Sequence, residues 1–301
     1  MQTFLPYPDF QQSAAALDTT RLGKQRVEAL QILRTLVIPG YGRQSHPAVR
    51  MWMGHVPALT KYALAMADEW IARGHPDNTR ESMKEFAPQA AHPDYANKIP
   101  MPPWLGEPDF HASHRSRLIQ KDPRFYDALF ADTPTDLELI WPEPLRDLIP
   151  EDPYEDFVWV LRAPVGDVAP EKIDKVGMPV GGKVKSVNDE HDDEVTESDK
   201  KGPRFGAKDV RKAPAQKAKK PTRNRKRQDE AFRTLPGNTT VLIPLEDGAR
   251  FVLGKLQGRP ITLDDGRFGR TFEVQEIIDR ADFDYPALLQ DPRVFFPIPG
   301  Q

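Results

Sequence analysis

Hydrophobic residues recur at helical spacing through most of residues 1–145. The clearest pattern runs from about Thr20 to Val37, where apolar side chains share one face at 100° per residue and polar side chains share the other. Pro39-Gly40 ends this pattern, and Asp9 is suited to cap a short helix before it. The pattern predicts helices over about 10–16, 20–37 and 57–73, a helix that begins at Pro108 or Asp109 and runs to about Gln120, and a shorter helix after Pro123.

The pattern changes to the alternation typical of β-strands after about residue 155. Strand-like segments lie at 157–161, 240–245, 250–256, 259–263 and 271–278. The dipeptides Asp247-Gly248 and Asp265-Gly266 are turn signals between some of them. We therefore expect a small antiparallel sheet or partial barrel over 239–301, to which the strand at 157–161 can be added.

These patterns predict a multidomain α+β chain. Residues 178–232 have few large apolar side chains and separate blocks of acidic and basic residues, which is typical of disorder. The expected parts are an all-α domain (1–145), a connecting segment with a strand (146–177), a disordered acidic-then-basic linker (178–232) and a small β domain (233–301).

Composition narrows the class of protein. The sequence has no cysteine, which excludes a disulfide framework, a thiolate zinc site and thiol catalysis. It also lacks an apolar run long enough for a membrane helix and a secretory signal pattern. We therefore expect a cytoplasmic protein with no membrane partner, associated with the nucleoid if it binds DNA.

Charge is strongly segregated along the chain, whose net charge is −3. From Lys200 to Arg227 there are 13 Lys/Arg residues and one Asp, a local charge of +12, and an acidic block at 189–199 precedes them. Flexible cations of this kind bind phosphates without reading base sequence. One interpretation is a tether for DNA or RNA; the other is a solvated linker that folds back on the acidic block.

Glu28 is the only carboxylate between Thr19 and Ala67, a span that holds seven Lys/Arg residues. The conservative interpretation is an exposed helix acid that pairs with Lys24, which contributes a few tenths of a kcal/mol. The alternative is an acid or base that acts on a polyanion held by the surrounding cations.

The sequence offers little for a metal or a cofactor. His46 and His55 show no recognised ligand spacing, and His111 and His114 form only a weak candidate pair. Nucleotide-binding glycine loops and a nucleophile-elbow serine do not occur. Trp52, Trp70 and Trp104 are interpreted as core residues. We expect neither a metal nor a cofactor.

Three segments resemble the pyrimidine-dimer DNA glycosylases of the endonuclease V type, which are small all-helical repair enzymes. The first segment, 17–30, places Glu28 at the catalytic glutamate of the family. The second comprises His46-Pro47, Gly54-His55-Val56 and the helix that ends at 70–74. The third runs from His111 to Leu118 and continues through Lys121 to Tyr126. The resemblance covers about the first 130 residues.

The resemblance implies a glycosylase that flips out a base at a lesion and attacks the sugar C1′ with its own N-terminal amine. The attack expels the base and leaves a Schiff base, and β-elimination then cuts the strand. It implies that Glu28 moves protons at the sugar and stabilises the iminium. The candidate nucleic-acid contacts are Arg21, Lys24, Arg26, His46, His114, Arg115, Arg117 and Lys121.

The N-terminus departs from the family pattern. The nucleophile of the family is a small residue, usually Thr, exposed by removal of the initiator Met. Here Gln2 follows Met1, and a bulky second residue should prevent that removal. The expected nucleophile is therefore the amine of Met1, with Thr3 inside the chain.

Two other hypotheses stay open at this point. The chain could be a non-catalytic nucleic-acid-binding protein, in which Glu28 is a surface acid and residues 200–227 provide most of the affinity. Alternatively, the β domain recruits a partner protein, and no signature in 233–301 identifies that partner. The lesion, the choice between DNA and RNA, and the oligomeric state are not specified by the sequence.

Overall fold

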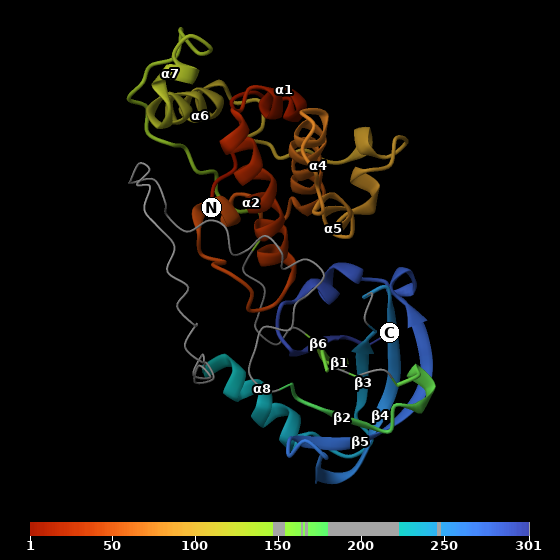
Figure 1. The fold of residues 1–301 in the computed structure, drawn as a ribbon. Coiled ribbons are helices and arrows are strands. Elements are labelled where there is room, and N and C mark those ends of the chain that lie inside the picture. The colour runs from red at the N-terminus through yellow and green to blue at the C-terminus, as the bar shows by residue number, and fades with distance from the viewer. Residues whose placement is uncertain (147–153, 164, 166–167, 180–222, 246–247, 301) are drawn as a thin grey trace, which may run out of the picture. The chain divides into compact units, whose positions relative to one another are not determined.

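A computed structural model describes residues 1–146, 154–163, 165, 168–179, 223–245 and 248–300 (Figure 1). The chain divides into two compact units. Unit 1 comprises Met1–Glu155 and Asp284–Asp291, and unit 2 comprises Asp156–Phe283 and Pro292–Gln301. Within the described ranges, no helix is long and apolar enough to cross a membrane.

Unit 1 is helical, as the sequence predicts. Asp9 caps the first helix by accepting a hydrogen bond from Gln12 N at 2.7 Å, and Asp18 caps the second by accepting one from Arg21 N at 3.1 Å. The helices are α1 (Phe10–Ala15), α2 (Thr19–Val37), α3 (Pro47–Arg50), α4 (Val56–Ala72), α5 (Arg80–Lys84), α6 (Pro108–Lys121) and α7 (Pro123–Tyr126).

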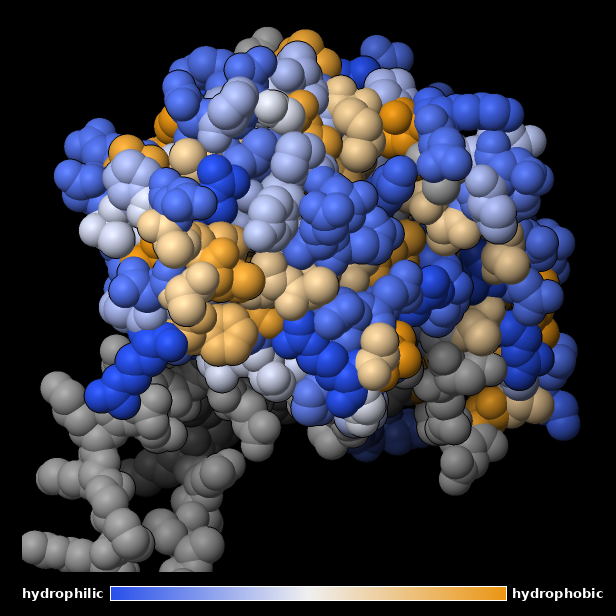
Figure 2. Space-filling model, turned by 90° about the horizontal axis from the view of Figure 1, so that it is seen from above, coloured by the Kyte–Doolittle hydropathy of each residue, from blue (hydrophilic) through white to orange (hydrophobic). Residues whose placement is uncertain are grey.

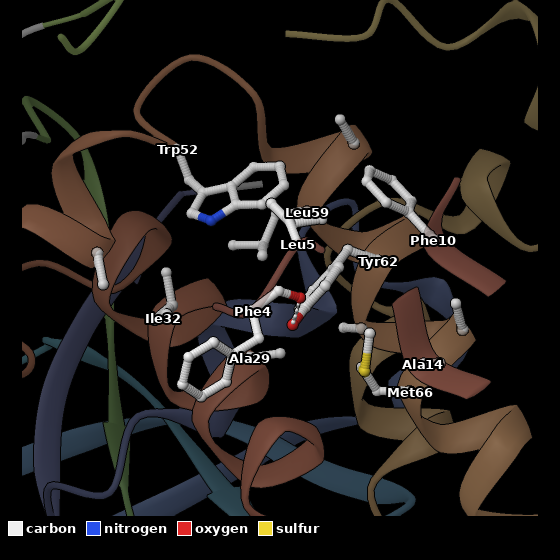
Figure 3. Close-up of a cluster of buried hydrophobic side chains, with 14 of the residues drawn as sticks. Phe4, Leu5, Phe10, Ala14, Ala29, Ile32, Trp52, Leu59, Tyr62 and Met66 are labelled. Atoms are coloured by element: carbon white, nitrogen blue, oxygen red, sulfur yellow. Dashed lines mark hydrogen bonds between the residues drawn. The ribbon is translucent and has the colours of Figure 1, made fainter. Parts of the chain in front are cut away.

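The core of unit 1 forms where α1, α2 and α4 meet, and it includes residues that precede the first helix. Figure 3 shows Phe4 and Leu5 among side chains of α2 and α4. Trp52 is fully buried against Tyr62 and Trp104, with ring centroids 5.9 Å and 5.0 Å apart. The N-terminal residues are therefore part of the core.

A segment from near the other end of the chain also belongs to unit 1. Residues 286–290 form the 3₁₀ helix η6, in which Ala287, Leu288 and Leu289 are buried. The Gln290 amide accepts a hydrogen bond from Arg34 Nε at 3.2 Å, and it donates to the Ser82 carbonyl at 2.8 Å. The sequence predicts one β domain over 233–301 and does not assign 284–291 to unit 1, because no periodic pattern distinguishes this segment.

Unit 2 contains a six-stranded sheet. Its order is β2-β5-β4-β3-β1-β6, and neighbouring strands are antiparallel except for β1 and β3. The predicted α+β class is confirmed, and the strand at 157–161 does join the C-terminal strands. The strands are β1 (Phe157–Leu161), β2 (Lys175–Gly177), β3 (Thr240–Pro244), β4 (Arg250–Thr262), β5 (Phe268–Asp279) and β6 (Phe295–Pro299).

Two features of the sheet differ from the prediction. The segments 250–256 and 259–263, predicted as separate strands, are one strand, β4, with a register shift between Gln257 and Ile261. Gly258, at φ 61°, lies in this irregular stretch and marks a bulge rather than a turn. The chain turns at Gly266 as predicted, whereas Asp247 of the other predicted turn lies outside the described residues.

The predicted linker also contains a helix. Residues 223–234 form α8, whereas the sequence pattern predicts disorder over 178–232. Phe232 anchors α8 because it is fully buried and meets Phe268 and Phe295 with ring centroids 5.8 Å and 5.6 Å apart. The acidic block and the basic run up to residue 222 lie outside the described residues.

One face of the molecule is shown in Figure 2. Hydrophilic residues cover most of this face, and its hydrophobic residues form patches that hydrophilic residues separate. Phe125 and Leu129, after α6, are among the exposed large apolar side chains of unit 1.

Candidate active site

Side chains hold the backbone of the first six residues in place. Phe4 N donates to Gln25 Oε1 at 2.7 Å, and the Tyr62 hydroxyl lies 3.1 Å from the Phe4 carbonyl oxygen. Thr3 is fully buried, and its hydroxyl oxygen accepts a hydrogen bond from Trp52 Nε1 at 3.1 Å. Burial holds the pKa of Tyr62 well above its usual value, so its hydroxyl stays protonated.

Two histidines of α6 bind the backbone of Leu5. Leu5 N donates to His114 Nδ1 at 3.3 Å, and His111 Nδ1 lies 2.7 Å from the Leu5 carbonyl oxygen. His111 Nε2 accepts a hydrogen bond from Gly106 N at 3.0 Å, so the proton of the neutral ring is on Nδ1 and is donated to Leu5. Both rings hydrogen-bond the Leu5 backbone through Nδ1, and both nitrogens of His111 are occupied. These hydrogen bonds disagree with a metal site formed by His111 and His114.

His114 should make unit 1 sensitive to acid. Its complete burial, and then the charge of His111, lower the pKa of His114 from 6.5 to about 3. Between pH 6.5 and 3, His114 binds a proton in the unfolded chain but stays neutral in the folded one. The contribution of neutral His114 to the free energy of unfolding is therefore fully present above pH 6.5 and is lost as the pH falls toward 3. For this one group the free energy of unfolding should fall by at most about 1.4 kcal/mol per pH unit.

The test is His114→Asn, which retains an acceptor for Leu5 N and does not titrate. Denaturant unfolding between about pH 6 and pH 4 should show a shallower dependence in the variant than in the parent, by about one proton. Equal slopes in the two proteins would show that His114 is not buried in its neutral form.

The first six residues bring the chain's α-amine to Glu28. Gln2 N donates to Glu28 Oε2 at 2.8 Å, and Met1 N lies 4.0 Å from Glu28 Oε1. Gln25 Nε2 donates to the same Oε2 at 3.2 Å, which fixes the carboxylate. The side chains of Met1 and Glu28 are 16% and 27% exposed, so the pair is accessible from solvent at its edge.

Lys121 of α6 is coupled to Glu28 and to cations of α2 and α6. Desolvation of the Lys121 ammonium group, and then the charges of Arg117 and Arg21, lower the pKa of Lys121. Glu28 acts on Lys121 in the opposite direction, and Lys24 adds to the lowering. Lys24, Arg117 and Lys121 are exposed. Lys121 is therefore electrostatically coupled to three other cations and to the Glu28 carboxylate.

Arg21 is the most constrained of these cations. Its guanidinium lies 2.6 Å from Asp18 Oδ2 and 3.5 Å from Asp122 Oδ2, and it stacks over Tyr126 at 5.4 Å from the ring centroid. The Tyr126 hydroxyl donates to Asp18 at 2.5 Å. These contacts join the start of α2 to α7 and hold Arg21 in place.

His46 lies on the amine side of the site. Burial, and then the positive charges of the α-amine and Arg43, lower the pKa of His46. Its Nδ1 accepts a hydrogen bond from Ala48 N at 3.1 Å and caps α3, so the neutral ring carries its proton on Nε2. His46 is thus a neutral hydrogen-bond donor near the α-amine.

Part of this site lies in a segment that matches a known protein family. Residues 1–83 match the pyrimidine dimer DNA glycosylase family. The match includes Met1, Glu28 and α1 to α4, and it confirms the predicted resemblance for the N-terminal region. The match covers 83 of the 301 residues and so characterises the N-terminal region alone. No curated protein and no solved structure matches the chain.

Three of the predicted DNA contacts in this glycosylase-like unit are engaged inside the protein. Arg26 is 6% exposed and forms an ion pair with Asp77, whose side chain is 0% exposed. His114 is fully buried. Arg115 donates to the Pro6 carbonyl at 2.8 Å and to Thr133 Oγ1 at 3.1 Å. The burial of Arg26 and His114 indicates structural roles, whereas Arg115 stays partly exposed, as Arg21 does.

The sequence pattern does not reveal the residues that position the N-terminus. Gln25 and Tyr62 bind the Phe4 backbone, and Gln25 also binds Glu28. Gln25 lies three residues before Glu28 on α2, a spacing that makes two side chains neighbours on a helix surface. That spacing is the one signal that could have identified it. Among the described residues, no group of three or more His, Asp or Glu side chains is placed to hold a metal ion.

Proposed function

We propose that unit 1 is a DNA glycosylase and abasic-site lyase that acts on pyrimidine-dimer-like lesions, with the Met1 amine as nucleophile and Glu28 as its acid and base. The observation that carries the proposal is the position of Glu28. One carboxylate oxygen faces the α-amine at 4.0 Å, and the other accepts the Gln2 N–H at 2.8 Å. The family match at residues 1–83 supplies the reaction class.

The reaction begins at the flipped-out nucleotide. The amine nitrogen bonds to C1′ as the C1′–N bond to the base breaks, and the base leaves with that electron pair and takes up a proton. Glu28 takes the amine proton and gives it to the ring oxygen O4′ as the C1′–O4′ bond breaks, which opens the sugar, leaves a cationic iminium and restores the carboxylate. Removal of a proton from C2′ then expels the 3′-phosphate. Glu28 can take up the amine and C2′ protons, and its negative charge stabilises the iminium.

The surrounding groups hold the strand. Lys24, Arg117 and Lys121 are exposed around Glu28 and would contact backbone phosphates, and Arg21 would do so from its fixed position. His46 would donate from Nε2 to a phosphate or sugar oxygen beside the amine.

Met1 is a better candidate nucleophile than Thr3. The Thr3 side chain is fully buried, and its hydroxyl is bound to Trp52. The Met1 nitrogen is a free α-amine beside Glu28, whereas the nitrogen of Thr3 is part of a peptide bond and is not nucleophilic.

Borohydride trapping on duplex DNA with an abasic site tests the proposal. Reduction of the iminium should give a covalent adduct that mass spectrometry maps to Met1. A protein with one glycine added before Met1 should give no adduct, because one residue moves the amine by up to about 3.6 Å while residues 2–6 stay held.

The same glycine added after Gln301 is the control and should leave trapping unchanged. An adduct on a lysine, or trapping by the N-terminally extended protein, would contradict the assignment. The absence of an adduct with intact Met1 would favour DNA binding without catalysis.

A further inference from the structure

Unit 2 carries a basic surface built from α8 and the bulge of β4. We propose that this surface, composed of Lys226, Arg227, Arg233 and Arg259, binds the phosphate backbone of duplex DNA. All four side chains are exposed. The choice of DNA as the polyanion rests on the function proposed for unit 1.

The orientation of α8 is fixed on its inner side. Phe232 is buried, and Gln228 Oε1 accepts hydrogen bonds from Val294 N and Phe295 N, each at 3.1 Å. Since these residues face the sheet, Lys226 and Arg227 are left on the outer side of the helix. Glu230 is exposed on α8, and the Asp229 side chain is 37% exposed but pairs with Arg225 at 3.3 Å, so Lys226 and Arg227 face one acid of this helix that does not pair with Arg225.

The bulge in β4 adds a second element to the surface. Gln257 pairs with Thr271 and Ile261 pairs with Gly269, so residues 258–260 stand opposite Arg270 alone. A bulge of this kind leaves its residues out of the ladder and re-aims their side chains. Arg259 is the central residue of the bulge and is exposed.

Buried Arg270 joins the two elements. Its side chain is 1% exposed and donates to the Leu235 carbonyl at 2.9 Å, just after α8, and to the Gly258 carbonyl at 3.0 Å, in the bulge. One guanidinium therefore fixes the backbone near Arg233 and the backbone next to Arg259. The Arg233 guanidinium also stacks on Phe268, 4.5 Å from the ring centroid.

This arrangement suits a backbone contact better than base readout. Fixed cations on a helix and a bulge can each neutralise a phosphate and release counterions, without donors placed for base edges. Binding by unit 2 would add affinity for undamaged flanking duplex, which the chemistry at Glu28 does not require.

The test is the salt dependence of binding of the full chain to an undamaged duplex. Arg233→Gln with Arg259→Gln should make the slope of log K against log[salt] shallower by about two units. Lys226→Gln with Arg227→Gln should have the same effect, and this pair does not disturb the contact of α8 with Phe268. Lys172→Gln with Lys175→Gln removes two exposed cations from the same unit and is the control.

The expected result is that both test variants lose slope while the control retains it. If the control loses as much slope as the test variants, or if none changes, the surface is not a DNA contact. Trapping at an abasic site under saturating DNA is measured in parallel. Loss of slope without any trapping would support this surface and contradict the function proposed for unit 1, so the two proposals fail separately.

Discussion

Replacing Glu28 by glutamine is expected to slow strand cleavage at an abasic site by about 100- to 10,000-fold, the range that one general acid or base contributes. Glutamine keeps an oxygen that can accept the Gln2 N–H, so the N-terminal residues should stay in place. It cannot take up a proton from the amine or balance the charge of the iminium. The measurement is single-turnover cleavage of an abasic duplex.

The control for this variant is Glu81→Gln on α5, where an exposed carboxylate pairs with Lys84 at 2.7 Å. It makes the same chemical change in the same unit and should leave cleavage unchanged. Equilibrium binding to the abasic duplex should weaken little, or even tighten, in Glu28→Gln, because a negative charge near the phosphates is removed. Cleavage at the parental rate in Glu28→Gln would exclude Glu28 as the acid and base.

Replacing Arg26 by alanine is expected to lower the free energy of unfolding of unit 1 by about 3–5 kcal/mol, the cost of leaving a buried partner charge uncompensated. Asp77 would lose its cation in a position that is 0% exposed. Arg26 also stacks over Trp70, 5.2 Å from the ring centroid, and Trp70 is one of the five tryptophans whose fluorescence follows unfolding. Denaturant unfolding followed by that signal measures the loss.

Lys24→Ala provides the contrast on the same helix. Lys24 is exposed, so its removal should change the free energy of unfolding by less than about 0.5 kcal/mol. It should instead make the salt dependence of DNA binding shallower by about one unit. If Arg26→Ala shows the behaviour expected of Lys24→Ala, then Arg26 is a DNA contact and its burial does not persist in solution.

The difference between these two cations is within reach of the sequence. At 100° per residue, Lys24 and Arg21 lie within about 40° of Glu28 on α2, whereas Arg26 lies about 160° away, on the opposite face. Periodicity is strong enough to predict α2 and α4 closely, and it also separates the charges of α2. Grouping the cations by charge alone hides this separation.

The contact between Met1 and Glu28 cannot be derived from pattern. The residues between them include an extended segment whose backbone is bound by side chains of α2, α4 and α6 rather than by a neighbouring strand. Such bonds leave no repeat in the sequence. Among the sequence-based observations, only the family resemblance predicts that Glu28 lies beside the amine.

Unit 2 shows the same limit. Alternating residues predict β3 and β5, but β6 contains Pro297 and Pro299, which a sheet tolerates at its edge and which obscure the strand signal. The sequence pattern does not reveal α8 because the cations of this helix outnumber its few apolar residues, of which Phe232 alone is fully buried among those described.

The η6 segment has a consequence for the order in which the protein can be completed during synthesis. Domains usually fold as units, the N-terminal one first, while the ribosome is still adding residues. Unit 1 departs from this order because Leu288, Leu289 and Gln290 belong to it and Gln290 binds Arg34 of α2. Nearly the whole chain must therefore be translated before unit 1 acquires its last buried side chains, and a nascent chain arrested before residue 284 would expose the surface that they cover.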